Sequence, residues 1–175
     1  VFLAIAALCL IILLKNTTFP PQTTPNPESK IQNFYSQTLI YIITISTAIT
    51  TGLFFFNQSG FYFQKALGMS DWFYQNIFIG IALSWFIGGK ISEYLIKNDI
   101  LSPRATIQTG GCIAFTFALI LYGLTQTWIP SLSPSMQAIM TLSLTMALMI
   151  GTSFQIGNCI GSALSLFQEN SGQAA

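Results

Sequence analysis

The sequence predicts an all-α protein, a polytopic bundle of transmembrane helices, and three observations lead to this prediction. Hydrophobic residues make up 52% of the 175 residues and charged residues only 6%, with a mean hydropathy of +0.62. Soluble domains carry roughly a quarter charged residues, so this chain could not coat itself with a soluble surface. Four apolar segments can supply the roughly 20 residues that a spanning helix needs. An open β-sheet is excluded from a bilayer because its edge groups would lack hydrogen-bond partners.

Five apolar segments occur along the chain. They lie at about 1–14, 36–63, 72–95, 105–124 and 136–166. The first would rise only about 21 Å as a helix, short of the roughly 30 Å hydrocarbon core, so we interpret it as a truncated transmembrane helix. Because the chain starts at Val1 inside this run, we expect the sequence to be a fragment of a longer protein.

The connections between these segments differ in character. Residues 15–35 hold four prolines among polar residues, which predicts an extended linker that is not helical throughout. The stretch 64–70 is a short turn, with Gly68 as the helix breaker and Ser70 as the N-cap of the next helix. Asp71 then lies where a negative charge suits a helix N-terminus.

The basic residues predict the orientation in the membrane. Successive loops must lie on alternate sides of the bilayer, and the first and third loops carry five basic residues, whereas the second carries one and the fourth none. The positive-inside rule therefore places the first and third loops, and with them the proline-rich linker, in the cytoplasm. The five residues are Lys15, Lys30, Lys90, Lys97 and Arg104, and the single one is Lys65.

Small residues recur at intervals of four in the apolar segments. A spacing of four places side chains on one helix face, and small side chains there let two helix backbones approach closely. Tight structural packing is one interpretation, and surfaces that slide against each other during transport are the other. The candidate packing residues are Gly80, Ser84, Gly88, Gly110, Gly157 and Gly161.

The chemistry available to this chain is narrow. It contains no histidine, and its three cysteines lie in apolar runs without metal spacing, so we expect no metal, no cofactor and no enzymatic activity. No basic patch indicates nucleic acid. All eleven acidic and basic residues lie at segment ends or in loops, so no proton-relay acid is expected near a bilayer centre.

Two polar spots inside apolar runs are candidates for a substrate path. Phe56, Asn57 and Gln58 lie where amides interrupt an aromatic run, which would suit either a broken helix that binds an amphipathic ligand or an aromatic belt at the membrane interface. Asn158 is an amide in an apolar segment. It could form a hydrogen bond between helices or line a cavity, and we favour the former.

A loop motif of Gly89, Glu93 and Lys97 is similar to a motif of the major facilitator superfamily of transporters. That family has a glycine, an acid four residues later and then basic residues, which form a charge network at the cytoplasmic gate. Gly89, Glu93 and Lys97 match this pattern, whereas Tyr94 and Ile96 stand where a base and a second glycine are usual.

The wider chain resembles one branch of that superfamily, the Bcr/CflA-type drug-resistance transporters. The similarity rests on the short stretches 67–70, 102–104, 157–159 and 172–174, and it adds Arg104 to the gate motif. It implies that 1–14 ends the N-terminal half and that 15–35 joins the two six-helix halves. Residues 36–175 would then hold four helices of the C-terminal half, so the chain would run from helix six to the loop after helix ten.

The resemblance implies secondary active transport, namely proton-coupled efflux of small amphipathic compounds by alternating access in a bacterial inner membrane. The implied partners are the substrate, protons, the lipid bilayer and the remaining half of the same transporter. The alternative is a membrane scaffold or assembly subunit that moves nothing. A buried acid in the first helices of the remaining half would favour the transporter.

Overall fold

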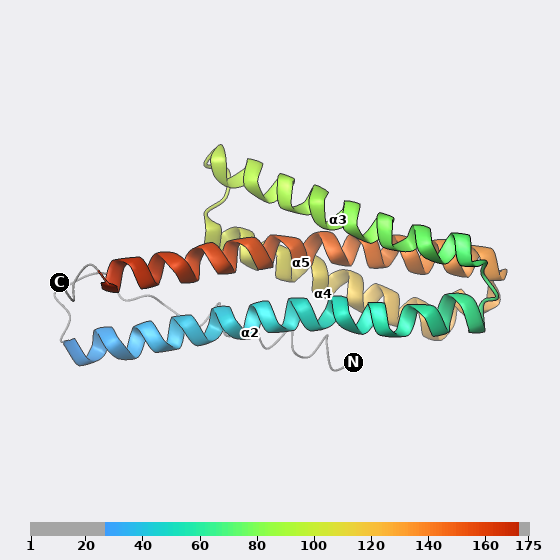
Figure 1. Cartoon of the computed structure of the whole chain (residues 1–175), viewed down its shortest axis with the longest axis horizontal. Helices are drawn as coiled ribbons and strands as arrows, with labels where there is room; N and C mark the ends of the chain where they lie inside the picture. The colour runs from blue at the N-terminus through green and yellow to red at the C-terminus, as the bar shows by residue number, and fades with distance from the viewer. Residues whose placement is uncertain (1–26, 172–175) are drawn as a thin grey trace.

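The computed structural model describes the backbone of residues 27–171 and the side chains of residues 37–165. The predicted segment 1–14, the linker up to residue 26 and the stretch 172–175 lie outside the described residues. The described part is almost entirely helical and contains no strand. Its elements are α2 (Pro27–Ser59), the π-helix η1 (Gly60–Ala66), α3 (Asp71–Lys97), α4 (Pro103–Thr127), the short 3-10 helix η2 (Ile129–Ser131) and α5 (Pro134–Ser171) (Figure 1).

Four helices of the described part are long and apolar enough to cross a membrane, which confirms the prediction of an all-α chain that is compatible with an integral membrane protein. They are Gln37–Ala66, Asp71–Lys97, Pro103–Thr127 and Pro134–Ser165. Large apolar side chains such as Leu39, Leu53 and Phe86 are exposed on their outer faces, while threonines and serines are buried between them. This distribution suits a lipid environment, because so much exposed apolar surface would be unfavourable in water.

The helix ends follow the local signals of the sequence. Gly68 adopts a φ of 66°, which only glycine takes without strain, and it ends the helical run before α3. The hydroxyl of Ser70 accepts a hydrogen bond from the backbone N–H of Phe73 at 3.3 Å, as an N-cap does. Ser102 caps α4 in the same way through the N–H of Ala105 at 3.2 Å.

The helix α2 differs from the prediction at both ends. It begins at Pro27, so residues 27–35 of the expected linker are helical. Proline is well suited to a first helical position, because its missing N–H would have no partner there in any case. The helix also does not break at Asn57 and Gln58, but continues and changes to a π-helix at Gly60. The broken helix that we considered for this stretch is therefore wrong.

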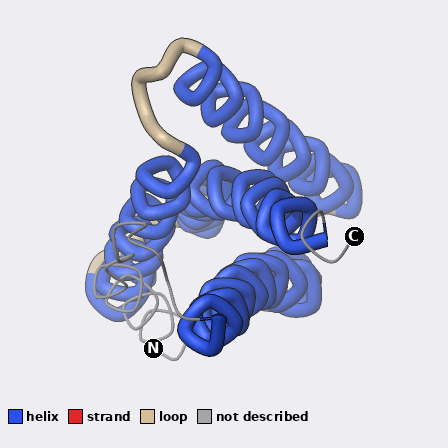
Figure 2. The backbone as a smooth tube through the Cα atoms, turned by 90° about the vertical axis from the view of Figure 1, so that its left-hand side faces the viewer, coloured by secondary structure: helices blue, strands red, loops and turns tan. Residues whose placement is uncertain are grey.

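The helix α5 is the central element of the bundle. It packs against α2, α3 and α4, and it lies between α3 and α2 in both views (Figures 1 and 2). The helix α3 diverges from α5 towards its C-terminal end (Figure 1). A hydrophobic core that includes Phe63, Ile77, Ile81 and Met149 joins η1, α3 and α5. This core fixes one side of the space in which the candidate site lies.

Candidate functional site

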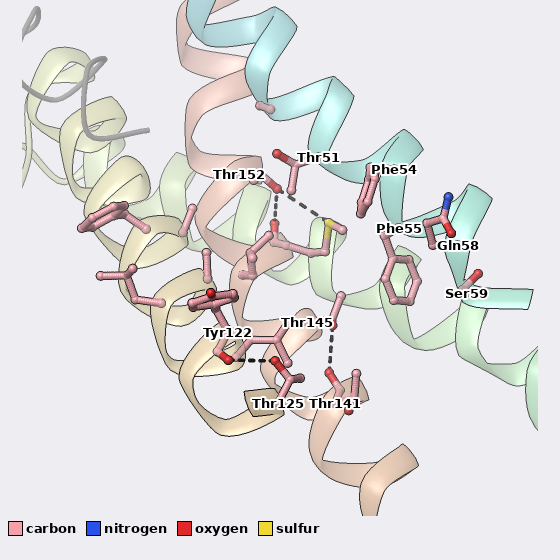
Figure 3. Close-up of a pocket in the computed structure, with 18 of the residues that line it drawn as sticks. Thr51, Phe54, Phe55, Gln58, Ser59, Tyr122, Thr125, Thr141, Thr145 and Thr152 are labelled. Atoms are coloured by element: carbon pink, nitrogen blue, oxygen red, sulfur yellow. Dashed lines mark hydrogen bonds between the residues drawn. The ribbon is translucent and has the colours of Figure 1, made fainter. Parts of the chain in front are cut away.

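A cavity of about 750 Å³ lies between α2, η1, α4 and α5 (Figure 3). Its volume falls in the range of roughly 300–1,000 Å³ that is usual for sites of drug-sized ligands. The wall combines aromatic side chains with hydroxyl and amide groups. None of the charged side chains within residues 37–165 is part of this wall.

The aromatic part of the wall comes from three elements. Phe54 and Phe55 of α2, Tyr62 of η1 and Phe115 and Tyr122 of α4 all line the cavity. The Tyr62 hydroxyl lies 3.3 Å from the Thr141 hydroxyl of α5, which ties η1 to the opposite wall. Aromatic faces of this kind bind flat apolar groups without demanding one particular ligand.

The α5 wall carries a polar stripe, formed by Thr141, Thr145, Thr152 and Gln155, which all line the cavity. The steps of four, seven and three residues between them return to the same side of a helix. Thr145 donates to the carbonyl of Thr141 at 2.8 Å, and Thr152 donates to the carbonyl of Met149 at 2.9 Å. These two hydroxyls have used their hydrogen atoms within α5, but an oxygen lone pair of each can still accept a hydrogen bond.

The α2 wall repeats this arrangement. Thr47 and Thr51 line the cavity, and the hydroxyls donate to the carbonyls of Ile43 at 2.9 Å and Thr47 at 2.8 Å respectively. The indole N–H of Trp85, which belongs to α3, donates to the Thr152 hydroxyl at 3.2 Å. The cavity wall is therefore linked to α3 through Trp85.

Gln155 is the member of the polar stripe that sequence reasoning missed. Its side chain is 8% exposed and packs against α4, where Cγ lies 3.4 Å from the position that a Cβ would take on Gly110. No hydrogen bond engages its amide within the described residues, and neither amide atom is sealed from the accessible surface. The sequence feature that could have identified Gln155 is its helical spacing from the three threonines of the stripe. We looked only for an amide within an apolar segment, and that criterion selected Asn158.

The predicted substrate-path residues separate in the structure. Gln58 lines the cavity on the same helix as Phe55 and Ser59 (Figure 3), and its side chain is exposed. Phe56 is not part of the wall, and its ring stacks on Phe78 of α3 with centroids 5.5 Å apart. Asn57 is exposed and also lies outside the wall. One residue of this predicted cluster is therefore placed at the cavity.

Asn158 forms a hydrogen bond between helices rather than part of the cavity wall. Its amide N–H donates to the Ser92 hydroxyl of α3 at 2.7 Å and to the Phe154 carbonyl at 2.6 Å. Of the two interpretations of this residue, the structure shows the one that we favoured. The bond joins α5 to α3, whereas the cavity opens among α2, α4 and α5.

The predicted gate residues lie at the end of the bundle where α3 meets α4. Glu93 pairs with Lys90 at 2.7 Å, one turn away on the exposed surface of α3. Lys97 is exposed, and Arg104 is half-buried in the first turn of α4. Gly89 has no described atom within 4 Å of the position of a Cβ, so it makes no close helix contact there. The close contact belongs to its neighbour Gly88.

The predicted packing residues fall into two groups. Gly88 faces Ile150, whose carbonyl oxygen would lie 2.8 Å from an added Cβ, and Gly110 faces Gly151, whose carbonyl oxygen would lie at 2.6 Å. Gly80 faces Met146 with its sulfur at 3.5 Å from that position. Ser84 is buried and donates to the carbonyl of Gly80 at 2.8 Å. These four residues lie in or beside helix contacts.

Gly157 and Gly161 differ from this group. Both are exposed, and no described atom lies within 4 Å of the position of an added Cβ. The structure therefore does not bring them into a helix contact among the described residues. The spacing correctly predicted a shared face, but whether another helix covers a face depends on the tertiary arrangement. Gly151, which sequence analysis did not single out for packing, makes a close approach instead, with the Ala114 nitrogen 2.7 Å from the position of an added Cβ.

In comparisons with known proteins, no family model, no curated protein and no solved structure matches this chain.

Proposed function

We propose that this chain is part of a secondary active transporter that moves small amphipathic molecules across a membrane by alternating access. The observation that carries the proposal is the cavity of about 750 Å³, which lies among helices able to cross a membrane and combines aromatic rings with hydroxyl and amide groups. A space of this size and lining suits a drug-sized ligand with apolar and polar parts. A scaffold subunit would have no need of such a cavity.

The family and the driving force extend this proposal. We infer a place among the Bcr/CflA-type transporters of the major facilitator superfamily, acting in a bacterial inner membrane. The gate-like residues Gly89, Glu93 and Lys97 support this inference, as do the order and length of the helices. Coupling to protons needs an acid that can be buried, and the wall described above holds none. In this proposal the coupling acid belongs to the remaining half of the transporter.

A cavity-filling substitution tests the proposal. Thr51 lines the cavity, whereas its neighbour Thr50 is exposed and lies outside the wall. Thr51→Phe places a ring in the ligand volume, and we expect the apparent affinity for transported substrate to fall by about tenfold or more, equivalent to about 1.4 kcal/mol. The matched control Thr50→Phe adds the same ring to the lipid-facing surface and should transport normally.

The measurement is gradient-driven transport of small amphipathic dyes by the intact protein in proteoliposomes, normalised to the protein incorporated. A wild-type protein that moves no dye under a proton gradient would favour the scaffold alternative. Equal transport by the Thr51 and Thr50 variants would show that the cavity is not on the substrate path.

A further inference from the structure

Two of the four polar groups on the α5 wall have committed their hydrogen atoms, and a third, Thr141, pairs with Tyr62 in a contact in which either hydroxyl can donate. Thr145 and Thr152 donate to carbonyl oxygens of α5, and Thr141 lies 3.3 Å from the Tyr62 hydroxyl. Towards a ligand, Thr145 and Thr152 can therefore act as acceptors. Their oxygens can accept hydrogen bonds from a ligand. They cannot bind a ligand carbonyl, because a carbonyl needs a donor and both hydroxyl hydrogens are used within α5.

Gln155 supplies what this stripe lacks. Its amide can donate two hydrogen bonds and accept two, and no described residue engages it. The residue is 8% exposed and part of the cavity wall, so its amide meets the cavity rather than open surroundings. Because no hydrogen bond within the described residues occupies this amide, a ligand can pair with it without breaking an existing bond there. Gln58 and Tyr122 also carry polar groups on the wall, but both are exposed.

The absence of charged side chains from the wall, among residues 37–165, determines which net charge a ligand can have. The charged side chains among residues 37–165 all lie off the wall, and the ion pair Lys90–Glu93 is on the exposed surface of α3. An ion in the cavity would lose its hydration without gaining a counter-charge from these residues, which is unfavourable. An uncharged molecule avoids this penalty.

We propose that the cavity binds uncharged amphiphilic molecules that carry a carboxamide or a similar carbonyl group, and that Gln155 orients them by hydrogen bonding. The ligand's apolar body would lie against the rings of Phe54, Phe55 and Phe115, and its N–H would reach a threonine oxygen of the stripe. This inference rests on the proposed transport function and extends it, because it names the class of substrate and the residue that recognises it.

Three probes with one apolar body separate charge from shape. They are biphenyl carboxamide, biphenyl carboxylate and biphenyl trimethylammonium. Binding is measured by calorimetry on the intact protein in lipid nanodiscs, with protein-free nanodiscs subtracted and no ion gradient present. We expect the carboxamide to bind about tenfold or more tightly than either ion, because only the ions lose hydration without compensation.

The substitution Gln155→Met keeps the length of the side chain and removes the amide. We expect it to weaken carboxamide binding by about five- to tenfold, the usual effect of losing one or two hydrogen bonds. Gln155→Asn, which keeps an amide but withdraws it from the cavity, should also weaken binding and serves if the Met variant does not fold. The control is Gln108→Met on α4, because Gln108 is half-buried like many wall residues but lies outside the wall.

The outcomes separate this inference from the proposed function. Failure of the carboxamide to bind, equal binding of all three probes, or equal loss in the Gln155 and Gln108 variants would overturn the role of Gln155 and the ligand class. Selective binding that depends on Gln155 would support the inference even in a protein that transports nothing. If substitutions of Gln155 leave substrate transport unchanged, the proposed function stands and this inference is wrong.

Discussion

The helix α5 meets its neighbours in two opposite ways. Towards α4 its backbone is in near contact, since a Cβ added to Gly151 would lie 2.7 Å from the Ala114 nitrogen and 2.8 Å from the Gly110 carbonyl oxygen. Towards α2 it leaves a cavity of about 750 Å³. Gly151 and the cavity-lining threonines of α5 are all small or short, so we attribute the difference to the residues opposite them.

Opposite Gly151 stand a glycine and an alanine, and two backbones without bulky side chains can touch. Opposite the polar stripe of α5 stand phenylalanines of α2 and η1 and Tyr62 of η1, whose rings hold the helices apart. The contact fixes α4 and α5 as a unit, and the rings leave space for a ligand. Close packing and an open site can therefore occur along one helix.

The largest expected effect is a difference in stability between two glycine substitutions in α5, which should change the free energy of unfolding in opposite directions. Gly151→Ala places a methyl group against the backbone of α4, and we expect it to lower the free energy of unfolding by about 2–3 kcal/mol through overpacking. Gly157→Ala meets no described atom within 4 Å and should raise the free energy by about 0.5–1 kcal/mol, because alanine favours a helix.

Reversible unfolding of the intact protein in mixed micelles, followed by circular dichroism, measures both values. If the two substitutions destabilise the protein equally, Gly151 is not packed more tightly than Gly157, and the close contact between α4 and α5 is wrong.

The contact between α3 and α5 provides a smaller effect with a matched neighbour. Gly88→Ala should lower the free energy of unfolding by about 1–2 kcal/mol. Part of the clash is with the flexible Ser153 side chain, which can turn away, while the Ile150 carbonyl oxygen at 2.8 Å cannot. Gly89→Ala meets no described atom within 4 Å and should be neutral or slightly stabilising. The same unfolding measurement applies, and a larger cost at position 89 than at 88 would reverse our assignment of the packed face.

The smallest expected effect concerns the hydrogen bond between Asn158 and Ser92. A double-mutant cycle with Asn158→Leu and Ser92→Ala should give a coupling of about 0.6 kcal/mol, the average for such bonds within membranes. The value is small because the unfolded protein in the membrane also finds partners for these groups. Unfolding of the four proteins gives the coupling directly. Additive effects would mean that the bond does not contribute, and that Asn158 is free for another role.

Several features of this protein could be read from local sequence. The four long apolar segments predicted four helices able to span a membrane, because hydropathy and length are properties of each segment alone. Gly68 and Ser70 predicted where one helix stops and the next begins, since backbone conformation and capping are local. The start of α2 was missed, because proline breaks a helix interior but suits a first turn, and the sequence did not show which applied at Pro27.

Which residues meet was decided by the tertiary structure. Gly110 and Gly161 each belong to a series of small residues at intervals of four, so the sequence does not distinguish them. In the structure Gly110 is packed against another helix, whereas Gly161 is exposed among the described residues. Two amides three residues apart on α5 likewise read alike, but Asn158 is bound to Ser92, whereas Gln155 meets the cavity unpaired. Side chains three positions apart on a helix lie about 60° from each other around its axis. In this bundle that difference is enough for Asn158 to meet α3 and for Gln155 to meet the cavity. Periodicity fixes the faces of a helix, but only the packing of the whole bundle determines what lies against each face.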